Sequence, residues 1–149
     1  MDSTGSNTGT EPMAAATITL RLTIADPVAG VAYSLQDKAG TPVGPRIAGD
    51  GSISFDAPAT LSDDGRLTGP FVRREGPTRR FVYIAIGTSA GQHASEWSRR
   101  AKIDVHDIPA DLLAQAPQGR VLEVVLPGRA RDGGPACATV RPLQGWRAV

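Results

Sequence analysis

The residues of this chain best suited to chemistry are arginines, and six of them form three adjacent pairs within residues 69–105. The pairs are Arg73-Arg74, Arg79-Arg80 and Arg99-Arg100. A guanidinium can donate two parallel hydrogen bonds to a carboxylate or phosphate, so arginines near a loop form a candidate anion site. In a strand, however, adjacent side chains point to opposite faces, so at most one of each pair can face a shared pocket. The alternative is that these arginines are solvated charges that protect strand edges from aggregation.

Residues 87–96 form a long Gly-containing loop that supplies small hydrogen-bonding side chains, Gln92 and His93 among them. Gly87 and Gly91 permit a close backbone approach to a ligand. His93 is a candidate general base, although any exposed loop histidine has the same appearance in a sequence. The two histidines of the chain have no acidic neighbour at ligand spacing, so we predict no metal site.

A second Gly-containing loop spans residues 129–135. Asp132 followed by Gly133, Gly134 and Pro135 is typical of a tight turn. The functional alternative is an anion-binding nest of backbone amides beside Arg129 or Arg131.

In an antiparallel sandwich, loops at the same end converge, and such loops commonly carry binding sites. We therefore expect Arg131 and either Arg99 or Arg100 to form a positive pocket walled by Trp97. The predicted ligand-binding residues are Tyr83, Gln92, His93, Trp97, Arg99, Arg100, Arg131 and Asp132.

The elements that must position these residues are strands. Residues 81–86, FVYIAI, are predicted to form a strand buried on both faces, and residues 97–105 alternate as a half-buried antiparallel strand does. Further strands are predicted at 17–25, 31–36, 52–57, 120–126 and 136–141, with an edge strand or loop at 41–51 and a short helix that begins near Asp107 and ends before Pro117. We expect an all-β, mainly antiparallel fold: a single-domain β-sandwich or squat barrel of seven to eight strands with one short helix. Residues 1–16 are predicted to be a disordered tail and residues 17–149 one β domain.

Composition excludes several function classes. The net charge is +1, which indicates neither a nucleic-acid partner nor a membrane partner, yet residues 69–105 hold seven basic and three acidic residues. A single cysteine excludes an internal disulfide framework, and no run approaches the roughly 18 apolar residues of a membrane span. The first residues lack the features of a secretory signal, so we expect a cytoplasmic protein. No phosphate-binding loop or dinucleotide fingerprint is present, and we expect no cofactor.

Several segments together resemble a bacterial family known only as a domain of unknown function. They are GVAYSLQ (30–36), GPF (69–71), RFVYIAIGTSAGQ (80–92), SEWSRRAKI (95–103), VLEVVLPG (121–128) and RDGGPACATVRP (131–142), with Gly145-Trp146. The resemblance covers nearly everything from about Thr17 onward. It implies a single complete domain and brings no activity, cofactor or catalytic residue with it.

Three functions are compatible with these features. The first is a small binding module with an anion or small-molecule site at the loop end of the sandwich. The alternative is a cofactor-independent lyase, isomerase or cyclase, with its pocket in a small barrel and Tyr83, His93 or Asp132 moving a proton. A third is self-association, for example as a homodimer, through an exposed Trp97 or Trp146.

Overall fold

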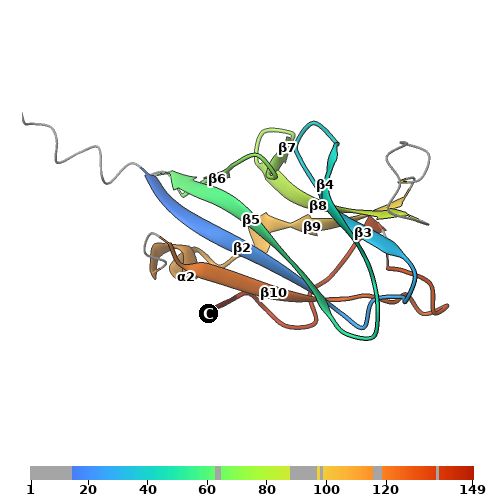
Figure 1. Cartoon of the computed structure of the whole chain (residues 1–149). Helices are drawn as coiled ribbons and strands as arrows, with labels where there is room; N and C mark the ends of the chain where they lie inside the picture. Colours follow the sequence, from blue (N-terminus) through green and yellow to red (C-terminus); the bar gives the residue numbers. More distant parts are fainter. Residues whose placement is uncertain (1–14, 63–64, 88–96, 98, 116–118, 137) are drawn as a thin grey trace, which may run out of the picture.

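The computed structural model describes residues 15–62, 65–87, 97, 99–115, 119–136 and 138–149, and these form two sheets that face each other (Figure 1). The order of strands in the first sheet is β12 (Arg147–Ala148), β10 (Val121–Pro127), β2 (Ala15–Ala25), β5 (Ile53–Ser62) and β6 (Leu67–Thr68). The order in the second sheet is β11 (Ala138–Thr139), β9 (Arg99–Asp104), β8 (Arg79–Gly87), β3 (Ala32–Gln36) and β4 (Pro42–Ile47), and β7 (Arg73–Glu75) also pairs with β8. The fold is therefore the predicted all-β sandwich; across the described ranges the sheets do not close into a barrel.

Strand β2 is the centre of the first sheet because its side chains alternate strictly. Ile18, Leu20, Leu22 and Ile24 are each at most 4% exposed and point between the sheets. The strand pairs antiparallel with β5 over its length and parallel with β10. It begins at Ala15, two residues before the predicted start. The predicted tail lies otherwise in residues 1–14, outside the described residues.

Strand β8 is the centre of the second sheet and confirms the prediction for residues 81–86. Val82, Ile84 and Ile86 point into the core between the sheets, while Phe81 and Tyr83 are buried on the outer face. Every residue from Arg80 to Gly87 is buried. The continuous apolar run is thus explained by cover on both faces of the sheet.

The predicted end of the strand at Ala57 is wrong, because β5 continues through Pro58 to Ser62. Pro58 lies opposite Thr19 of β2, whereas β6 pairs only with Thr60 and Leu61. At Pro58 the other side of β5 is consequently a sheet edge, where a residue without an N–H is tolerated.

The end of the chain also differs from the prediction. Strand β11 is only Ala138–Thr139, and a further short strand, β12, lies in the segment expected to be a tail. Helix α2 (Ala110–Gln115) follows Pro109, but the aspartate that caps the preceding 3-10 turn η2 (Val105–Asp107) is Asp104.

No helix in the described part of the chain is long and apolar enough to cross a membrane.

Candidate functional site

The two Gly-containing loops begin at the same end of the sandwich. Strand β8 ends at Gly87, which pairs with Ala32 at the start of β3. Strand β10 ends beside the end of β2, where the amide of Gly128 donates to the carbonyl of Ala25. Gln92 and His93 lie outside the described residues, so their place in the predicted pocket stays a prediction.

Residues 129–135 form the predicted turn. Arg129 pairs with Pro135 across it, and the carboxylate of Asp132 accepts from the amide of Gly134 at 2.9 Å. The amide of Gly133 donates to the carbonyl of Ala130 at 3.0 Å. Both glycine amides therefore have acceptors within the loop, and neither is available for the alternative anion-binding nest.

The predicted side chains around β8 gather on the outer face of the second sheet. Tyr83 is 2% exposed, and the guanidinium carbon of Arg100 lies 4.7 Å from the centre of its ring. Its hydroxyl donates to Glu75, which also accepts from Lys102 at 2.8 Å. Charged side chains therefore cover the outer side of the Tyr83 ring, and no open pocket is left there.

Trp97 packs with Ala32 and Ala85, two outer-face alanines, and forms a small cluster separate from the main core. Trp97 is consequently buried, as is Trp146, so neither presents the exposed indole that self-association was expected to use. Arg131 is exposed, and no described contact joins it to Arg99 or Arg100. The structure thus brings Tyr83 and Arg100 together and keeps Arg131 and Asp132 in a separate turn.

A cavity of about 220 Å³ lies at the opposite end of the sandwich, beside the start of β8. Its walls come from β6, the start of β8, η2 and α2. Figure 1 shows β6 and α2 at the same end of the sandwich. Most of the wall is apolar, and three basic residues interrupt it. The lining residues are Gly65, Arg66, Leu67, Arg80, Val105, His106, Ile108, Ala110 and Leu113.

Arg80 is the unusual member of this wall. It belongs to the inward-pointing series of β8, in register with Val82 and Ile84, and it is only 8% exposed. Its guanidinium has no carboxylate and no hydrogen-bond acceptor within the described residues. A buried charge without a counter-charge is costly, by several kcal/mol in typical proteins. An anion in the cavity would remove that cost.

The sequence contains a signal for the burial of Arg80. Alternation places Arg80 on the same face as Val82, Ile84 and Ile86, so a strand buried on both faces must bury this arginine too. The other member of the pair, Arg79, is exposed. As strand geometry predicts, the two arginines of this pair lie on opposite faces of β8.

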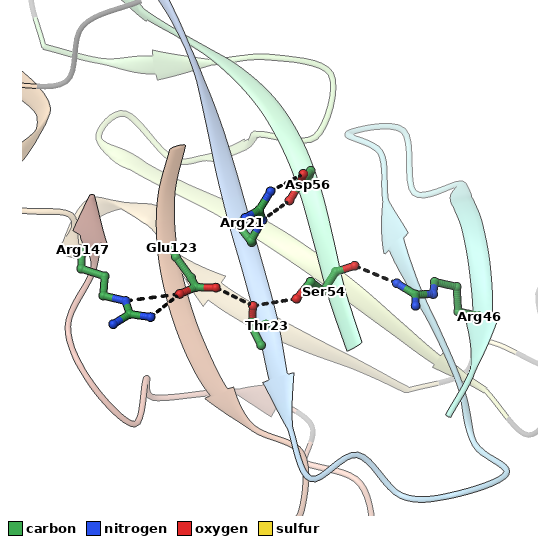
Figure 2. Close-up of polar contacts among 7 residues, drawn as sticks. All are labelled: Arg21, Thr23, Arg46, Ser54, Asp56, Glu123 and Arg147. Carbon is green, nitrogen blue, oxygen red and sulfur yellow. Dashed lines mark hydrogen bonds and ion pairs between the residues drawn. The ribbon is translucent and has the colours of Figure 1, made fainter. Parts of the chain in front are cut away.

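The outer face of the first sheet carries another polar group of residues, which Figure 2 shows in detail. Arg21 forms an ion pair with Asp56 at 2.8 Å, and Arg147 forms one with Glu123 at 2.8 Å. The hydrogen bond from Arg21 lowers the pKa of Asp56, and that from Arg147 lowers the pKa of Glu123. Each charged group here already has a partner, so this face leaves no charge to be neutralised by a ligand.

No group of three or more potential metal ligands occurs among the residues that the structure describes. The Arg80 cavity combines a buried arginine with the absence of a counter-charge among the described residues.

Comparison with known proteins gives a family and no activity. No curated protein and no solved structure is significantly similar to this chain. A family model described as a family of unknown function matches residues 18–149, which include both sheets and the cavity. The chain therefore belongs to DUF5990, a family of unknown function.

Proposed function

We propose that this protein is a small-molecule-binding module that holds a small organic anion on Arg80. The observation that carries the proposal is an arginine that is 8% exposed, lines a cavity and has no described counter-charge. The proposed anion site is therefore at the α2 end of the sandwich, whereas the two Gly-containing loops begin at the other end. A cytoplasmic location is part of the proposal and rests on the single cysteine of the sequence.

The cavity volume limits the ligand. Sites for drug-sized molecules hold roughly 300–1,000 Å³, and one water occupies about 30 Å³ of liquid. A volume of about 220 Å³ therefore suits a molecule much smaller than a nucleotide. The apolar wall formed by Leu67, Val105 and Ile108 favours a ligand with a hydrocarbon part. A small carboxylate or phosphate monoester with a short aliphatic or aromatic group meets both conditions.

The expected affinity follows from the same contacts. Two charge-assisted hydrogen bonds contribute roughly 3–6 kcal/mol, and burying about 100 Å² of apolar ligand surface adds about 2.5 kcal/mol. The cost of association reduces this gross sum by several kcal/mol. We therefore expect a dissociation constant in the high-micromolar to millimolar range for a simple probe.

The test is ligand-induced thermal stabilisation with benzoate and phenyl phosphate, and with benzyl alcohol as a neutral probe of similar shape. An anion at about 100 times its dissociation constant stabilises the protein by about 2.7 kcal/mol, or roughly 5–10 °C in Tm. We expect this shift with at least one anion, none with benzyl alcohol, and none with either anion for Arg80→Met. The matched control is Arg79→Met, which removes the same charge from the adjacent exposed position. Equal shifts in the two variants, or no binding of either anion to the native protein, would contradict the proposal.

A further inference from the structure

The two outer faces of the sandwich differ in how their charges are balanced. On the first sheet, Arg21 is paired with Asp56 and Arg147 with Glu123, and Arg46 donates to the carbonyl of Ser54 at its edge (Figure 2). On the outer face of the second sheet the described cations outnumber the acids by five to two, and one of the five, Lys102, is paired with Glu75 at 2.8 Å. The cations are Arg73, Arg79, Arg100, Lys102 and Arg141, and the acids are Glu75 and Asp104.

Aromatic rings hold several of these cations over the second sheet. The guanidinium carbons of Arg73 and Arg100 lie 5.3 Å and 4.7 Å from the ring centre of Tyr83. The ammonium of Lys102 lies 4.1 Å from the ring centre of Phe81. Cation–π contacts of this kind orient a charge without neutralising it. Arg73 and Arg100 are therefore held in place and remain able to attract an anion, whereas Lys102 is also paired with Glu75 at 2.8 Å.

A hollow of about 500 Å³ continues this face over β8, β9 and β11. Arg79, Lys102 and Arg141 line it, and Phe81 lies among them. Arg79 and Arg141 are exposed and have no described acidic partner, while the carboxylate of Asp104 accepts from the amide of His106 at 2.7 Å. The hollow is thus lined by three cations and one acid, Asp104, and Arg79 and Arg141 form no ion pair among the described residues.

We propose that this basic face, formed by Arg73, Arg79, Arg100, Lys102 and Arg141, binds an extended acidic segment of a partner protein. Arg100 and Lys102 are two residues apart on β9 and share one face of the sheet. Their spacing is roughly 7 Å, which equals the spacing of alternate side chains in an extended peptide. Alternate glutamates or aspartates of such a segment can therefore meet successive cations, and charge complementarity gives the encounter speed and specificity.

The same face is poorly suited to single-stranded nucleic acid. Nonspecific binding of single strands relies on bases that stack on exposed aromatic rings. Phe81 and Tyr83 are only 3% and 2% exposed, because cations cover their outward faces. The proposal therefore commits to a peptide partner, and nucleic acid becomes an outcome of the test.

The test measures binding of a labelled ten-residue oligoglutamate by fluorescence anisotropy, with decathymidylate as the competing probe. We expect the double variant Arg79→Glu/Arg141→Glu to weaken peptide binding by roughly tenfold or more, because it replaces two attractions with two repulsions. The matched control is Lys38→Glu/Arg120→Glu, which changes the net charge equally at exposed positions outside the basic face. We expect this control to change the affinity less than about twofold.

Three outcomes overturn the proposal: no peptide binding at low salt, equal weakening in both double variants, or tighter binding of decathymidylate than of oligoglutamate. All four substituted positions are exposed, so Tm should be unchanged and loss of folding does not obscure the result. Arg80→Met should leave peptide binding unchanged, since Arg80 faces the interior of the sandwich. The peptide site and the anion cavity can therefore fail independently.

Discussion

Arg79 and Arg80 are adjacent in the chain, yet Arg79 is exposed on the outer face of β8 and Arg80 is buried on its inner face. The first belongs to the basic face, and the second lines the cavity between the sheets. Two identical side chains therefore have opposite electrostatic surroundings. This contrast allows the role of each to be tested by the same substitution.

Arg80→Met should raise the free energy of unfolding of the ligand-free protein, or leave it unchanged. Taking one charge out of water costs several kcal/mol, and an apolar side chain of similar length does not carry this cost. Chemical denaturation measures the difference. Arg79→Met serves as the control and should change stability by no more than about 0.5 kcal/mol. Marked destabilisation by Arg80→Met alone would mean that Arg80 supports the fold.

Ile84→Ala should lower the free energy of unfolding by about 2–5 kcal/mol, the usual range for truncating a buried aliphatic side chain. Ile84 is fully buried at the centre of β8, between β3 and β9. The control is Val43→Ala on the edge strand β4, where the side chain is 44% exposed. A loss of less than about 1 kcal/mol at Ile84 would show that β8 is not the central buried strand.

Gly128→Ala should destabilise the protein because there is no room for a methyl group. A Cβ at this position would lie 2.5 Å from the carbonyl oxygen of Asp26 and 2.7 Å from that of Ala25. Overpacking of this kind costs about 1–3 kcal/mol or more, which thermal denaturation detects readily. Gly145→Ala is the matched control, since no atom lies within 4 Å of its Cβ position. Equal melting temperatures for the two variants would contradict the close approach of the 128–136 segment to the end of β2.

The sequence predicted the elements whose periodicity is long enough to recognise. Strand β2 has four alternating apolar residues, and β8 has a six-residue apolar run. Either pattern identifies a strand without knowledge of its partners. The strands β6, β7, β11 and β12 have only two or three residues, too few for a periodic pattern, and they form because a longer neighbour offers a free edge. The parallel pairing of β10 with β2 also depends on tertiary structure, and the local sequence of either strand does not predict it.

The candidate site was predicted less well, for a physical reason. Glycine and polar side chains in loops are associated with binding, whereas Arg80 belongs to a strand, and its sequence allows either an anion site or a solvated charge at a strand edge. The buried environment of Arg80 depends on Leu67 of β6 and on Val105 and Ile108 at the η2 turn, two segments that are distant from Arg80 in the sequence. Only their assembly encloses the guanidinium.

The Glu123–Arg147 ion pair should make stability sensitive to acid. The hydrogen bonds from Arg147 and Thr23 lower the pKa of Glu123 in the folded protein, with that from Arg147 the larger cause. An unfolded glutamate titrates near pH 4.3, so below that value the unfolded chain binds the proton more readily than the folded one. The stabilisation is therefore complete above about pH 4.3 and is lost as the pH falls through the lower pKa of the folded state.

Denaturant unfolding at a series of pH values from 7 to 2.5 measures this effect. Glu123→Gln should lower stability at pH 7 by about 1 kcal/mol, because the pair is partly exposed, and its curve should approach that of the native protein in acid. Asp50→Asn is the control, since Asp50 is exposed and has no described ion-pair partner; its curve should run parallel to the native one. If the Glu123→Gln difference is the same at pH 7 and at pH 2.5, the ion pair does not contribute and only the shape of the side chain matters.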